Sequence, residues 1–434
     1  MEKTDEVKNI VVLGAGFGGI TATLKLSRAI KNRELGKNCR VFLFNKTSYQ
    51  VYTPALYEIA AIPKGEANAV CLKTSICIDL EEIAGEDGFR LIGGEVRSID
   101  PARKFIILAS GETYNFDYLI VALGAETNFF NILGLKEYSL PLKTFEDAIR
   151  LRNKTEGIVL SGMSPIHVVI GGGGATGVEL AAEFENFVCY LKEKLLPAPK
   201  TCDVDITLVE GATNILPGFE PWLMKKARKR LEGLGVKILT DKIIAGVDGK
   251  TVTFKDGSVI PYHIFVWAGG VVSASVIKNF GLALSPKGRV IVNEYLEARL
   301  PISLEIQRGE PDDQAAHYYI YAIGDNAEFT GKDGTLLPGN IPIAEAEARI
   351  AAKNIIADIQ GTPHSQFFPM KKYPYILAVG RKYAIADLVF FRFSGFFGWC
   401  AKQLVELYYF IFVLGFRKAF SMWRMSVKYQ ASND

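Results

Sequence analysis

The sequence predicts an α/β protein with two similar units of parallel strands and helices, followed by an amphipathic helical C-terminal region. Three observations lead to this prediction. A glycine-rich segment follows an apolar stretch near the N-terminus, a second such segment recurs 158 residues later, and 14 aromatic residues lie in the last 46 positions. A length prior of about 150 residues per domain agrees with two or three folded units in this chain.

The first glycine-rich segment, "VVLGAGFGGITATL", has the pattern of a nucleotide-binding turn. Ile10–Leu13 form an apolar stretch, and Gly14, Gly16 and Gly19 separate it from a helix-forming stretch. Such glycines permit a tight turn, let the backbone approach a pyrophosphate and allow the helix to pack on the strand. The helix N-terminus also offers N–H groups to phosphate. We therefore expect a Rossmann-like strand, turn and helix.

The second segment, "HVVIGGGGATGVEL", repeats this pattern. Gly172, Gly174 and Gly177 each lie 158 residues after their counterparts, again between an apolar stretch and a helix-forming one. One glycine-rich turn is weak evidence, but two in the same strand and helix context indicate two bound dinucleotides.

The residues that end the second strand of each unit differ in charge. In "DITLVEGATN", Glu210 ends the strand, and no arginine follows it to accept a 2′-phosphate, so the second unit favours NADH over NADPH. In "VFLFNKTSYQ" the position is taken by Asn45, followed by Lys46. Asn45 can hydrogen-bond a ribose, but it also suits a simple turn.

Two more strands end in glycine, at the edge where open α/β sheets bind ligands. "FDYLIVALGAETN" predicts a buried strand that ends at Gly124, and "HYYIYAIGDNAEF" predicts one that ends at Gly324 and Asp325.

Composition excludes several classes of protein. The 50 basic and 47 acidic residues give a net charge of +3, too balanced to indicate a nucleic-acid partner. The N-terminus has no apolar segment typical of a secretory signal. The six cysteines form no CxxC or metal-ligand spacing, so we expect reduced, structural thiols.

Together these segments resemble the type II NADH dehydrogenases, single-subunit NADH:quinone oxidoreductases among the flavoproteins that bind two dinucleotides. The resemblance extends over the whole chain, and it rests on the order of many short motifs: "GAGFGG", "TPALYEIA", "FDYLIVALGA", "LKTFEDAIRLR", "GGGGATGVELAAE", "VWAGGV", "YAIGD" and "SGFFGWCAKQLVELYYFIFVLGFRK".

The resemblance implies FAD in the first Rossmann-like domain and NADH in the second, with hydride transfer from NADH to FAD and two electrons passed to a membrane quinone, without proton pumping. It places FAD at Gly14, Gly16, Gly18, Gly19, Asn45, Lys46, Thr53, Pro54, Ala122, Gly124, Gly324, Asp325 and Ala346. It places NADH at Gly172, Gly174, Gly177, Glu179, Glu210, Gly269 and Gly270.

Two glutamates are candidate catalytic residues. Glu179 follows the second glycine-rich turn, and Glu345 stands where the resembling family usually has glutamine, in "IPIAEAEAR". We hypothesise that Glu345 lies near the quinone headgroup and transfers a proton, which a glutamine cannot do. The alternative is that both glutamates of this segment are ordinary residues of an Ala/Glu-rich helix.

The C-terminal region indicates a membrane surface. Its longest apolar run, Leu407–Phe416, is 10 residues, short of the about 20 that cross a bilayer. Helical spacing puts Leu404 and Tyr408 with Ile411 and Phe412, away from Lys402, Gln403 and Glu406. We expect a peripheral, monotopic enzyme on the cytoplasmic face that reaches a lipid-dissolved quinone. A homodimer contact is the alternative, compatible use of these aromatics, and we expect a homodimer.

Three other functions compete. A sulfide:quinone oxidoreductase needs redox cysteines near its flavin, and no cysteine lies between Cys77 and Cys189 or between Cys202 and Cys400. The disulfide-reductase branch needs paired cysteines after the first turn. A redox sensor without turnover is the non-enzymatic alternative, and an intact second turn with Glu210 argues against it.

The predicted organisation follows from these segments. We expect an FAD domain formed by residues 1–150 and 285–388, an NADH domain at 151–284, and a membrane-anchoring region at 389–434. Residues 299–314 are longer and more polar than a minimal connection, and a surface loop is predicted for them.

Overall fold

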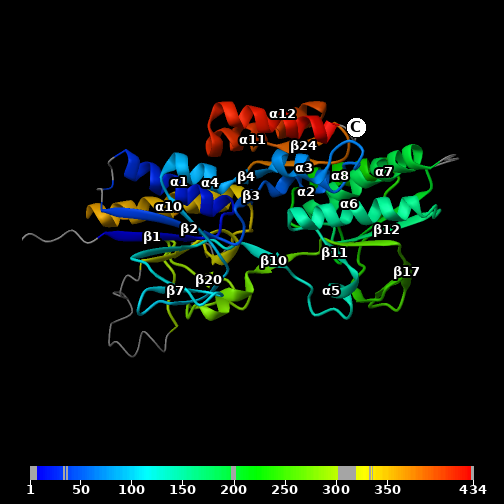
Figure 1. The fold of residues 1–434 in the computed structure, drawn as a ribbon. Helices are drawn as coiled ribbons and strands as arrows, with labels where there is room; N and C mark the ends of the chain where they lie inside the picture. Colours follow the sequence, from blue (N-terminus) through cyan, green and yellow to red (C-terminus); the bar gives the residue numbers. More distant parts are fainter. Residues whose placement is uncertain are drawn as a thin grey trace, which may run out of the picture. The chain divides into compact units, whose positions relative to one another are not determined.

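The computed structural model describes residues 7–32, 35, 38–196, 202–301, 319–331, 334 and 336–431. The chain forms two compact units, each built from separate segments (Figure 1). Unit 1 contains residues 1–50, 78–126 and 272–371, and unit 2 contains residues 51–77, 127–271 and 372–434. Short strands lie where the chain passes between units: β3 (Tyr49–Val51), β4 (Cys77–Asp79), β10 (Ala125–Thr127) and β19 (Val271–Ser273).

Unit 1 is organised around a five-stranded sheet in the order β21-β9-β1-β2-β5, in which all neighbours are parallel. Its strands are β1 (Lys8–Leu13), β2 (Cys39–Asn45), β5 (Arg90–Gly93), β9 (Tyr118–Val121) and β21 (Ile320–Ala322). All four residues of β9 are buried, as a central strand covered on both faces requires.

The described residues of unit 1 include the helices α1 (Phe17–Lys31), α4 (Leu80–Asp87) and α10 (Ile341–Gln360). Helices α1 and α10 pack against each other (Figure 1). The unit also contains an antiparallel sheet of β6 (Val96–Asp100), β7 (Phe105–Leu108) and β8 (Thr113–Asn115), a pair formed by β20 (Val290–Ile291) and β22 (Ala327–Glu328), and the 3₁₀ helices η2 (Ser275–Asn279) and η3 (Gly324–Asn326).

Unit 2 has a second parallel sheet, in the order β11-β18-β12-β13-β14. Its strands are β11 (Leu140–Pro141), β12 (Ile166–Gly171), β13 (Val204–Val209), β14 (Lys237–Leu239) and β18 (Ile264–Trp267). An antiparallel sheet of β15 (Ile244–Val247), β16 (Thr251–Phe254) and β17 (Val259–Pro261) adds to the core around Phe265 and Trp267.

The helices of unit 2 are η1 (Thr53–Ala55), α2 (Leu56–Ile59), α3 (Ala69–Ile76), α5 (Leu135–Tyr138), α6 (Phe145–Leu160), α7 (Ala175–Leu195) and α8 (Pro221–Gly233). Helix α6 begins with a capping box, in which Thr144 and Asp147 bond each other's backbone N–H groups.

The C-terminal part of unit 2 is an antiparallel sheet followed by two helices. The strands are β23 (Tyr375–Ala378), β24 (Ala384–Asp387) and β25 (Arg392–Gly395), and the helices are α11 (Phe396–Leu414) and α12 (Phe416–Gln430). Helix α11 packs on all three strands and on α12. Among the described helices, α11 alone has the length and apolar composition of a membrane-crossing helix, and 44% of its most apolar window is buried inside the protein.

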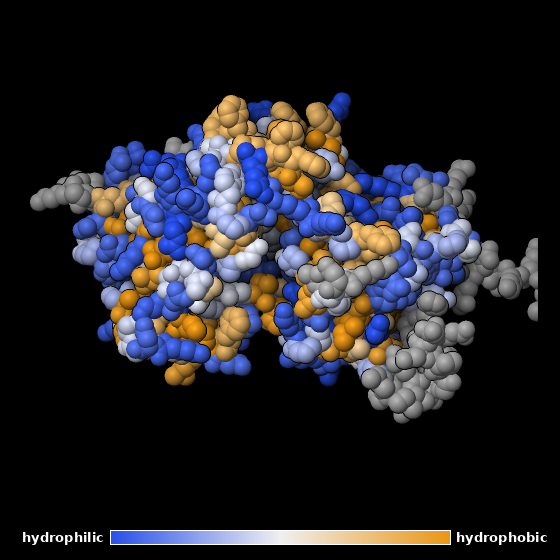
Figure 2. Space-filling view, turned by 180° about the vertical axis from the view of Figure 1, so that it is seen from behind, coloured by the Kyte–Doolittle hydropathy of each residue, from blue (hydrophilic) through white to orange (hydrophobic). Residues whose placement is uncertain are grey.

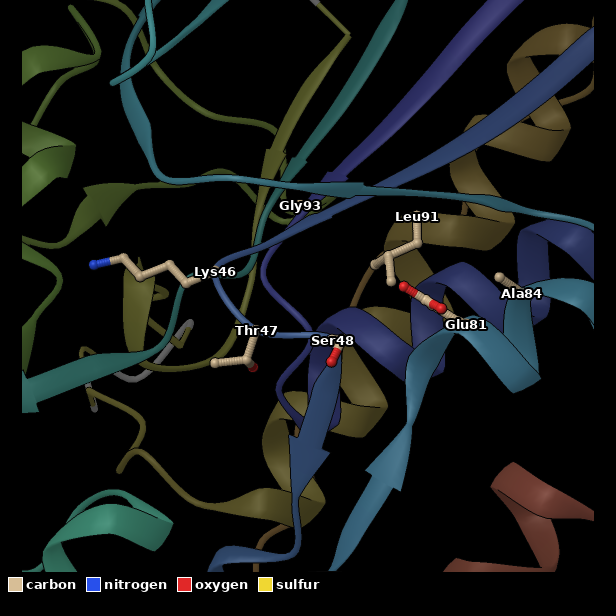
Figure 3. Close-up of a pocket in the computed structure, with 7 residues that line it drawn as sticks. All are labelled: Lys46, Thr47, Ser48, Glu81, Ala84, Leu91 and Gly93. Carbon is tan, nitrogen blue, oxygen red and sulfur yellow. The ribbon is translucent and has the colours of Figure 1, made fainter.

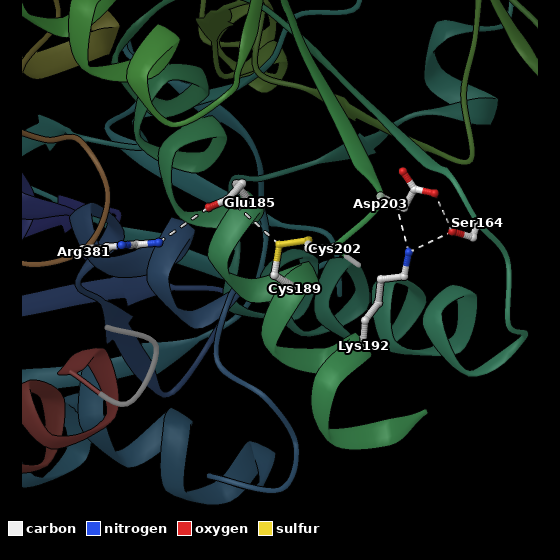
Figure 4. Close-up of a disulfide and its surroundings, with 7 residues drawn as sticks. All are labelled: Ser164, Glu185, Cys189, Lys192, Cys202, Asp203 and Arg381. Atoms are coloured by element: carbon white, nitrogen blue, oxygen red, sulfur yellow. Dashed lines mark hydrogen bonds and ion pairs between the residues drawn. A yellow bond between two sulfur atoms is a disulfide. The ribbon is translucent and has the colours of Figure 1, made fainter. Parts of the chain in front are cut away.

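The structure corrects one expectation about the cysteines. Cys189 in α7 and Cys202 just before β13 form a disulfide (Figure 4), so the prediction that all six thiols are reduced is wrong. No sequence pattern indicates this disulfide, because the two residues are 13 positions apart and match no redox spacing. Cys39, Cys71, Cys77 and Cys400 are free.

The compact units divide the chain differently from the predicted domains. Residues 51–77 and the C-terminal region belong to the same unit as the second parallel sheet. The reason is packing, since α12 contacts α3 and α2 contacts α6 and α7. Most of the predicted surface loop at 299–314 lies outside the described residues.

Candidate functional site

The first glycine-rich turn has a physical reason for each glycine. A Cβ on Gly14 would lie 2.4 Å from the carbonyl oxygen of Ala122, and one on Gly19 would lie 1.8 Å from the carbonyl oxygen of Gly14. Gly14 also has a φ of +97°, which disfavours other residues. By contrast, a Cβ on Gly16 would meet nothing within 4 Å. Two glycines therefore tighten the turn, and the third leaves an open side.

The second turn repeats this geometry position by position. A Cβ on Gly172 would lie 2.5 Å from the backbone of Ala268, and one on Gly177 would lie 1.9 Å from the carbonyl oxygen of Gly172. A Cβ on Gly174 would meet nothing within 4 Å. Both turns therefore present backbone that a phosphate can approach closely, which is what a dinucleotide pyrophosphate requires.

Each turn leads into a helix whose first N–H groups are available. Gly16 caps α1 and Gly174 caps α7, and neither end has a side-chain capping bond or an acidic residue in its first turn. The two helix N-termini therefore favour an anionic ligand.

Asn45 and Glu210 occupy equivalent places beside the two turns. The Asn45 Oδ1 accepts a hydrogen bond from Ala15 N at 3.0 Å, and the Glu210 Oε2 accepts one from Gly173 N at 2.7 Å. Ala15 and Gly173 are themselves 158 residues apart. Asn45 thus supports the turn as the acidic residue does, while adding no negative charge.

A cavity of about 410 Å³ lies beside the second turn. It is lined by Gly172, Glu210, Trp267 and Gly269, and also by Phe130, Ile132, Val209, Gly211, Lys242, Ile243, Ile244 and Lys255. Gly269 is needed at its wall, because a Cβ there would lie 2.2 Å from the Trp267 ring. Gly270, next in the chain, has a φ of +139°. The mixture of apolar walls and Glu210 suits an adenosine group.

A second cavity, of about 310 Å³, lies past the end of β2 in unit 1 (Figure 3). It is lined by Lys46, Thr47, Ser48, Glu81, Ala84, Leu91 and Gly93. The Lys46 side chain points away from Glu81 and Leu91 (Figure 3), and its Nζ forms an exposed ion pair with Glu95 Oε1 at 2.6 Å.

Asn326 was not identified from the sequence. This residue lies in η3, which begins at Gly324, and its side chain bonds to Gly124. Its side chain is fully buried. Its Oδ1 accepts a hydrogen bond from Gly124 N at 2.9 Å, and its Nδ2 donates to Gly124 O at 2.6 Å. The residue follows Asp325 in "GDN", and its amide fixes the end of β9 against η3. An asparagine directly after a strand-ending glycine and aspartate was the available signal.

Glu347 is a second residue that the sequence left unassigned. Its Oε2 accepts a hydrogen bond from Gly324 N at 2.6 Å, and only 2% of its surface is exposed. Burial raises its pKa to about 8, although the Gly324 hydrogen bond opposes this change. Asp325, two residues before Ala327, is half-buried. It lies close to Gly339, because a Cβ on Gly339 would be 2.2 Å from the Asp325 Oδ1.

Three further predicted FAD residues lie in η1 and α10. Thr53 and Pro54 are in η1, which belongs to unit 2. Ala346 is half-buried in α10, but Ala344 is the residue that contacts both glycine positions, since its side chain lies within 3.2–3.6 Å of the Cβ sites of Gly324 and Gly18.

Glu345 forms an ion pair with Arg349 one helical turn later, with Oε2 and Nη2 3.2 Å apart. Its side chain is 16% exposed. Burial raises the pKa of Glu345, and Arg349 lowers it again in part. A partly buried carboxyl with a raised pKa suits proton transfer, and the ion pair equally suits an ordinary helical pair.

Glu179 belongs to a cluster of buried charges in unit 2. The Nζ of Lys402 in α11 lies 2.6 Å from Glu58 Oε1 in α2. Glu183 and Glu406 are also buried, and the Glu406 Oε2 accepts a hydrogen bond from Gln430. The Glu179 Oε1 accepts one from Ala378 N at 3.4 Å.

Electrostatics in this cluster keep protons available near neutral pH. Burial raises the pKa of Glu179 to about 8, although Lys402 lowers it in part. Burial lowers the pKa of Lys402, but Glu58, Glu406 and Glu179 outweigh this and raise it overall. Burial also raises the pKa of Glu406. A carboxyl that titrates near pH 8 can donate and accept protons under physiological conditions.

Comparison with known proteins agrees with this geometry. A family model described as pyridine nucleotide-disulphide oxidoreductase matches residues 8–348. The chain belongs to this family. For a pyridine nucleotide-disulphide oxidoreductase, two dinucleotide turns of the kind found at Gly14 and Gly172 are the expected arrangement, and the expected cofactors FAD and NADH agree with the family.

Individual relatives narrow the resemblance. The chain is 27% identical to the demethylphylloquinone reductase NdbB of Synechocystis over 94% of this chain and 93% of the relative. It is 26% identical to the type II NADH:quinone oxidoreductase of Haemophilus influenzae over 83% of each. Its fold matches the structure of NDH2 from Plasmodium falciparum in complex with NADH, with a TM-score of 0.78 at 19% identity over 98% of each chain.

These findings bear on the predictions from the sequence. The predicted α/β fold class and the resemblance to type II NADH dehydrogenases are confirmed. The roles assigned to single site residues stay predictions.

Proposed function

We propose that this protein is a peripheral membrane flavoenzyme that oxidises NADH and reduces a membrane quinone without pumping protons. The observation that carries the proposal is the pair of matching glycine-rich turns, at residues 14–19 and 172–177, which we call the two cradles. Each has one glycine with open space beside it at a helix N-terminus. The relatives whose names include NADH and quinone support the same reaction.

The unit 1 residues suit FAD. Gly14, Gly16 and Gly19 would receive its pyrophosphate, the cavity beyond Asn45 would receive its adenosine end, and Asp325 would accept hydrogen bonds from its sugar-alcohol chain. When bound, FAD supplies the redox chemistry by accepting a hydride from NADH and passing two electrons to the quinone.

The unit 2 residues suit NADH. Gly172, Gly174 and Gly177 would receive its pyrophosphate, and Glu210 would accept hydrogen bonds from the adenosine ribose. A 2′-phosphate would lie beside the Glu210 carboxylate, so we propose a preference for NADH over NADPH.

Reduction of a quinone to a quinol takes two electrons and two protons. The hydride from NADH accounts for both electrons and one proton, and we assign the supply of the other proton to Glu179 with Lys402. The raised pKa of Glu179, about 8, leaves it largely protonated at neutral pH. Lys402 connects it electrostatically to Glu58 and Glu406. Glu345, paired with Arg349, is the second candidate donor. Replacing Glu179 with Gln should slow quinone reduction and shift its pH profile. The rate of flavin reduction by NADH, measured separately, shows whether Glu179 also contacts NADH.

The membrane partner follows from an apolar face on α11, α12 and the residues before them (Figure 2). Its exposed members include Phe397 at 75%, Tyr408 at 67% and Leu404 at 62%, while Gln403 and Glu406 on the same helix are buried. Helix α11 thus buries Gln403 and Glu406 together with apolar residues such as Phe410, and its outward side is apolar. This arrangement suits a helix that lies in the bilayer interface on the cytoplasmic face. We also propose that the enzyme forms a homodimer.

The experiment is an anaerobic titration of the FAD-loaded protein with NADH, NADPH and sulfide, followed by a soluble quinone. We expect flavin bleaching with NADH and reoxidation by quinone. Bleaching by sulfide but not by NADH would establish a sulfide:quinone oxidoreductase instead. Bleaching without any steady-state turnover would establish a sensor.

A further inference from the structure

Helix α8 carries a concentration of positive charge that the proposed reaction does not use. Its 13 residues, "PWLMKKARKRLEG", include five basic side chains and one acidic one. Helix α12 similarly has four basic side chains and no acidic one. The whole chain has a net charge of only +3, so the positive charge is gathered on these two helices of unit 2.

The sides of α8 are fixed by its contacts. Leu223, Ala227 and Leu231 are buried against unit 2. The next stripe contacts the C-terminal sheet, because Lys226 Nζ donates to Ser394 Oγ at 2.8 Å and Arg230 Nε donates to Val379 O at 3.2 Å. At 3.6 residues per turn, Lys225 and Lys229 lie opposite the buried stripe, and both are exposed.

The contact beside these lysines is the hairpin of β24 and β25. Trp222 of α8 lies between two cations, with Lys226 Nζ 5.4 Å and the Arg392 guanidinium 5.8 Å from its ring. The buried Asp387 anchors the hairpin, because its Oδ2 lies 3.0 Å from both Lys372 Nζ and Arg392 Nε. The hairpin position is therefore set by α8 and by buried charge pairs.

The tip of this hairpin is aromatic and exposed. Leu388 N donates to Phe391 O at 2.9 Å, which closes the turn, and Val389 adopts a φ of +74° within it. Phe390 is 89% exposed and Phe391 is 71% exposed. Phe396 and Phe397, at the start of α11, are also exposed, at 56% and 75%. Only the four residues of β25 separate them in sequence from the tip.

We propose that α8 and this hairpin tip form a second membrane contact that binds anionic lipid headgroups. The α8–hairpin surface consists of Lys225, Lys229, Phe390 and Phe391. The two phenylalanines enter the interface, where aromatic rings are favoured, and the lysines lie at the headgroups. This proposal rests on the proposed function, because it specifies the lipid partner of the same enzyme. The charge and the exposed rings together fit an anionic bilayer better than a neutral one.

The test is flotation of the FAD-loaded full chain with vesicles of phosphatidylcholine alone and vesicles that also contain phosphatidylglycerol. Lys225→Glu together with Lys229→Glu should lower binding to the anionic vesicles by roughly tenfold or more at low salt. Binding to the neutral vesicles should not change. Phe390→Ser with Phe391→Ser should lower binding to both kinds of vesicle.

The matched control is Lys154→Glu with Lys250→Glu, which reverses the same charge at two exposed lysines of unit 2 outside α8 and the C-terminal region. It should bind anionic vesicles as the unchanged protein does. The proposal is overturned if the α8 variant also binds them unchanged, if the control loses as much binding, or if the α8 variant instead alters only the oligomeric mass in sedimentation.

A soluble-quinone assay of the same variants separates this proposal from the proposed function. If no variant or parent protein reduces quinone with NADH but lipid binding depends on Lys225 and Lys229, the function is wrong and the surface stands. If turnover is normal and lipid binding ignores these lysines, the surface is wrong and the function stands.

Discussion

At the scale of single residues, buried carboxyl groups are the feature that most separates this chain from a simple nucleotide-binding scaffold. Glu347 supports Gly324 in unit 1, and Glu179 lies in the Lys402 cluster of unit 2. Burial raises the pKa of both to about 8. A protonated carboxyl costs less to bury than a carboxylate, so these groups carry their protons at neutral pH.

Glu347 should make the stability of unit 1 depend on pH. Its pKa in the folded state, about 8, exceeds the ordinary value of 4.5 for a glutamate, so the folded state binds more protons than the unfolded state between these values. The contribution of Glu347 to the free energy of unfolding is therefore fully present below about pH 4.5 and is lost as the pH rises to about 8. Between pH 5 and pH 8, the melting temperature of the Glu347→Gln variant should fall by less than that of the unchanged protein. Equal losses in the two proteins would contradict this account.

At the scale of elements, α11 buries polar residues together with apolar ones and leaves several large apolar residues exposed. Its polar residues Gln403 and Glu406 are buried, and Leu404, Val405 and Tyr408 are exposed. The buried polar residues of α11 bond to α2 and α12, through Glu58 and Gln430. Its membrane-facing orientation is thus set by hydrogen bonds and ion pairs inside unit 2.

Lys402→Met should destabilise the attachment of α11. It would leave the buried Glu58 without its cation, and breaking a buried pair in this way costs about 3–5 kcal/mol. Differential scanning calorimetry should show a lower melting temperature for the variant. Leu404→Ser on the exposed side of the same helix is the control, expected to change stability by about 0.5 kcal/mol or less while weakening vesicle binding.

The Cys189–Cys202 disulfide should stabilise unit 2 without contributing to the reaction. Cys189 lies 15 residues after Gly174, about 22 Å along α7 from the dinucleotide end. Closing a loop of this size contributes about 3 kcal/mol. Cys202→Ser should lower the melting temperature to that of dithiothreitol-treated protein and leave turnover unchanged, whereas Cys400→Ser should change neither. A loss of flavin reduction by NADH in Cys202→Ser would show that the disulfide does more.

At the scale of the whole molecule, two equivalent cradles in one chain allow their ligands to be removed separately. Gly16 and Gly174 occupy the same place in the two turns, and a side chain at either meets no protein atom within 4 Å. Each also caps a helix, where aspartate is well tolerated. An added carboxylate would therefore repel a pyrophosphate while the unit stays folded.

Gly16→Asp should yield protein without bound FAD, and Gly174→Asp should keep FAD but lose its reduction by NADH. Flavin absorbance and the rate of flavin bleaching measure the two losses. Reduction of the flavin of Gly174→Asp by dithionite serves as the control for its chemical competence. Identical behaviour of the two variants would mean that the turns do not bind different dinucleotides.

The cradles were predictable from the sequence because their physics is local. A strand, three glycines and a helix N-terminus lie within about a dozen residues, and the first and third glycine of each turn are required by the close approach of neighbouring backbone. Glu210 and Asn45 were found for the same reason, since each stands at the end of the next strand after its glycine-rich turn and helix. The apolar side of α11 was visible in its helical spacing.

The remaining features depend on residues that are distant in sequence. Asn326 contacts Gly124 across 202 positions, Lys402 contacts Glu58 across 344, and Lys226 contacts Ser394 across 168. No local pattern predicts such pairs, because a buried partner is chosen by packing after the elements have formed. The sequence by itself determined the two nucleotide turns and an apolar C-terminal helix. Only the tertiary structure decided that buried charges fix that helix and that a basic helix of the second unit lies beside an exposed aromatic hairpin.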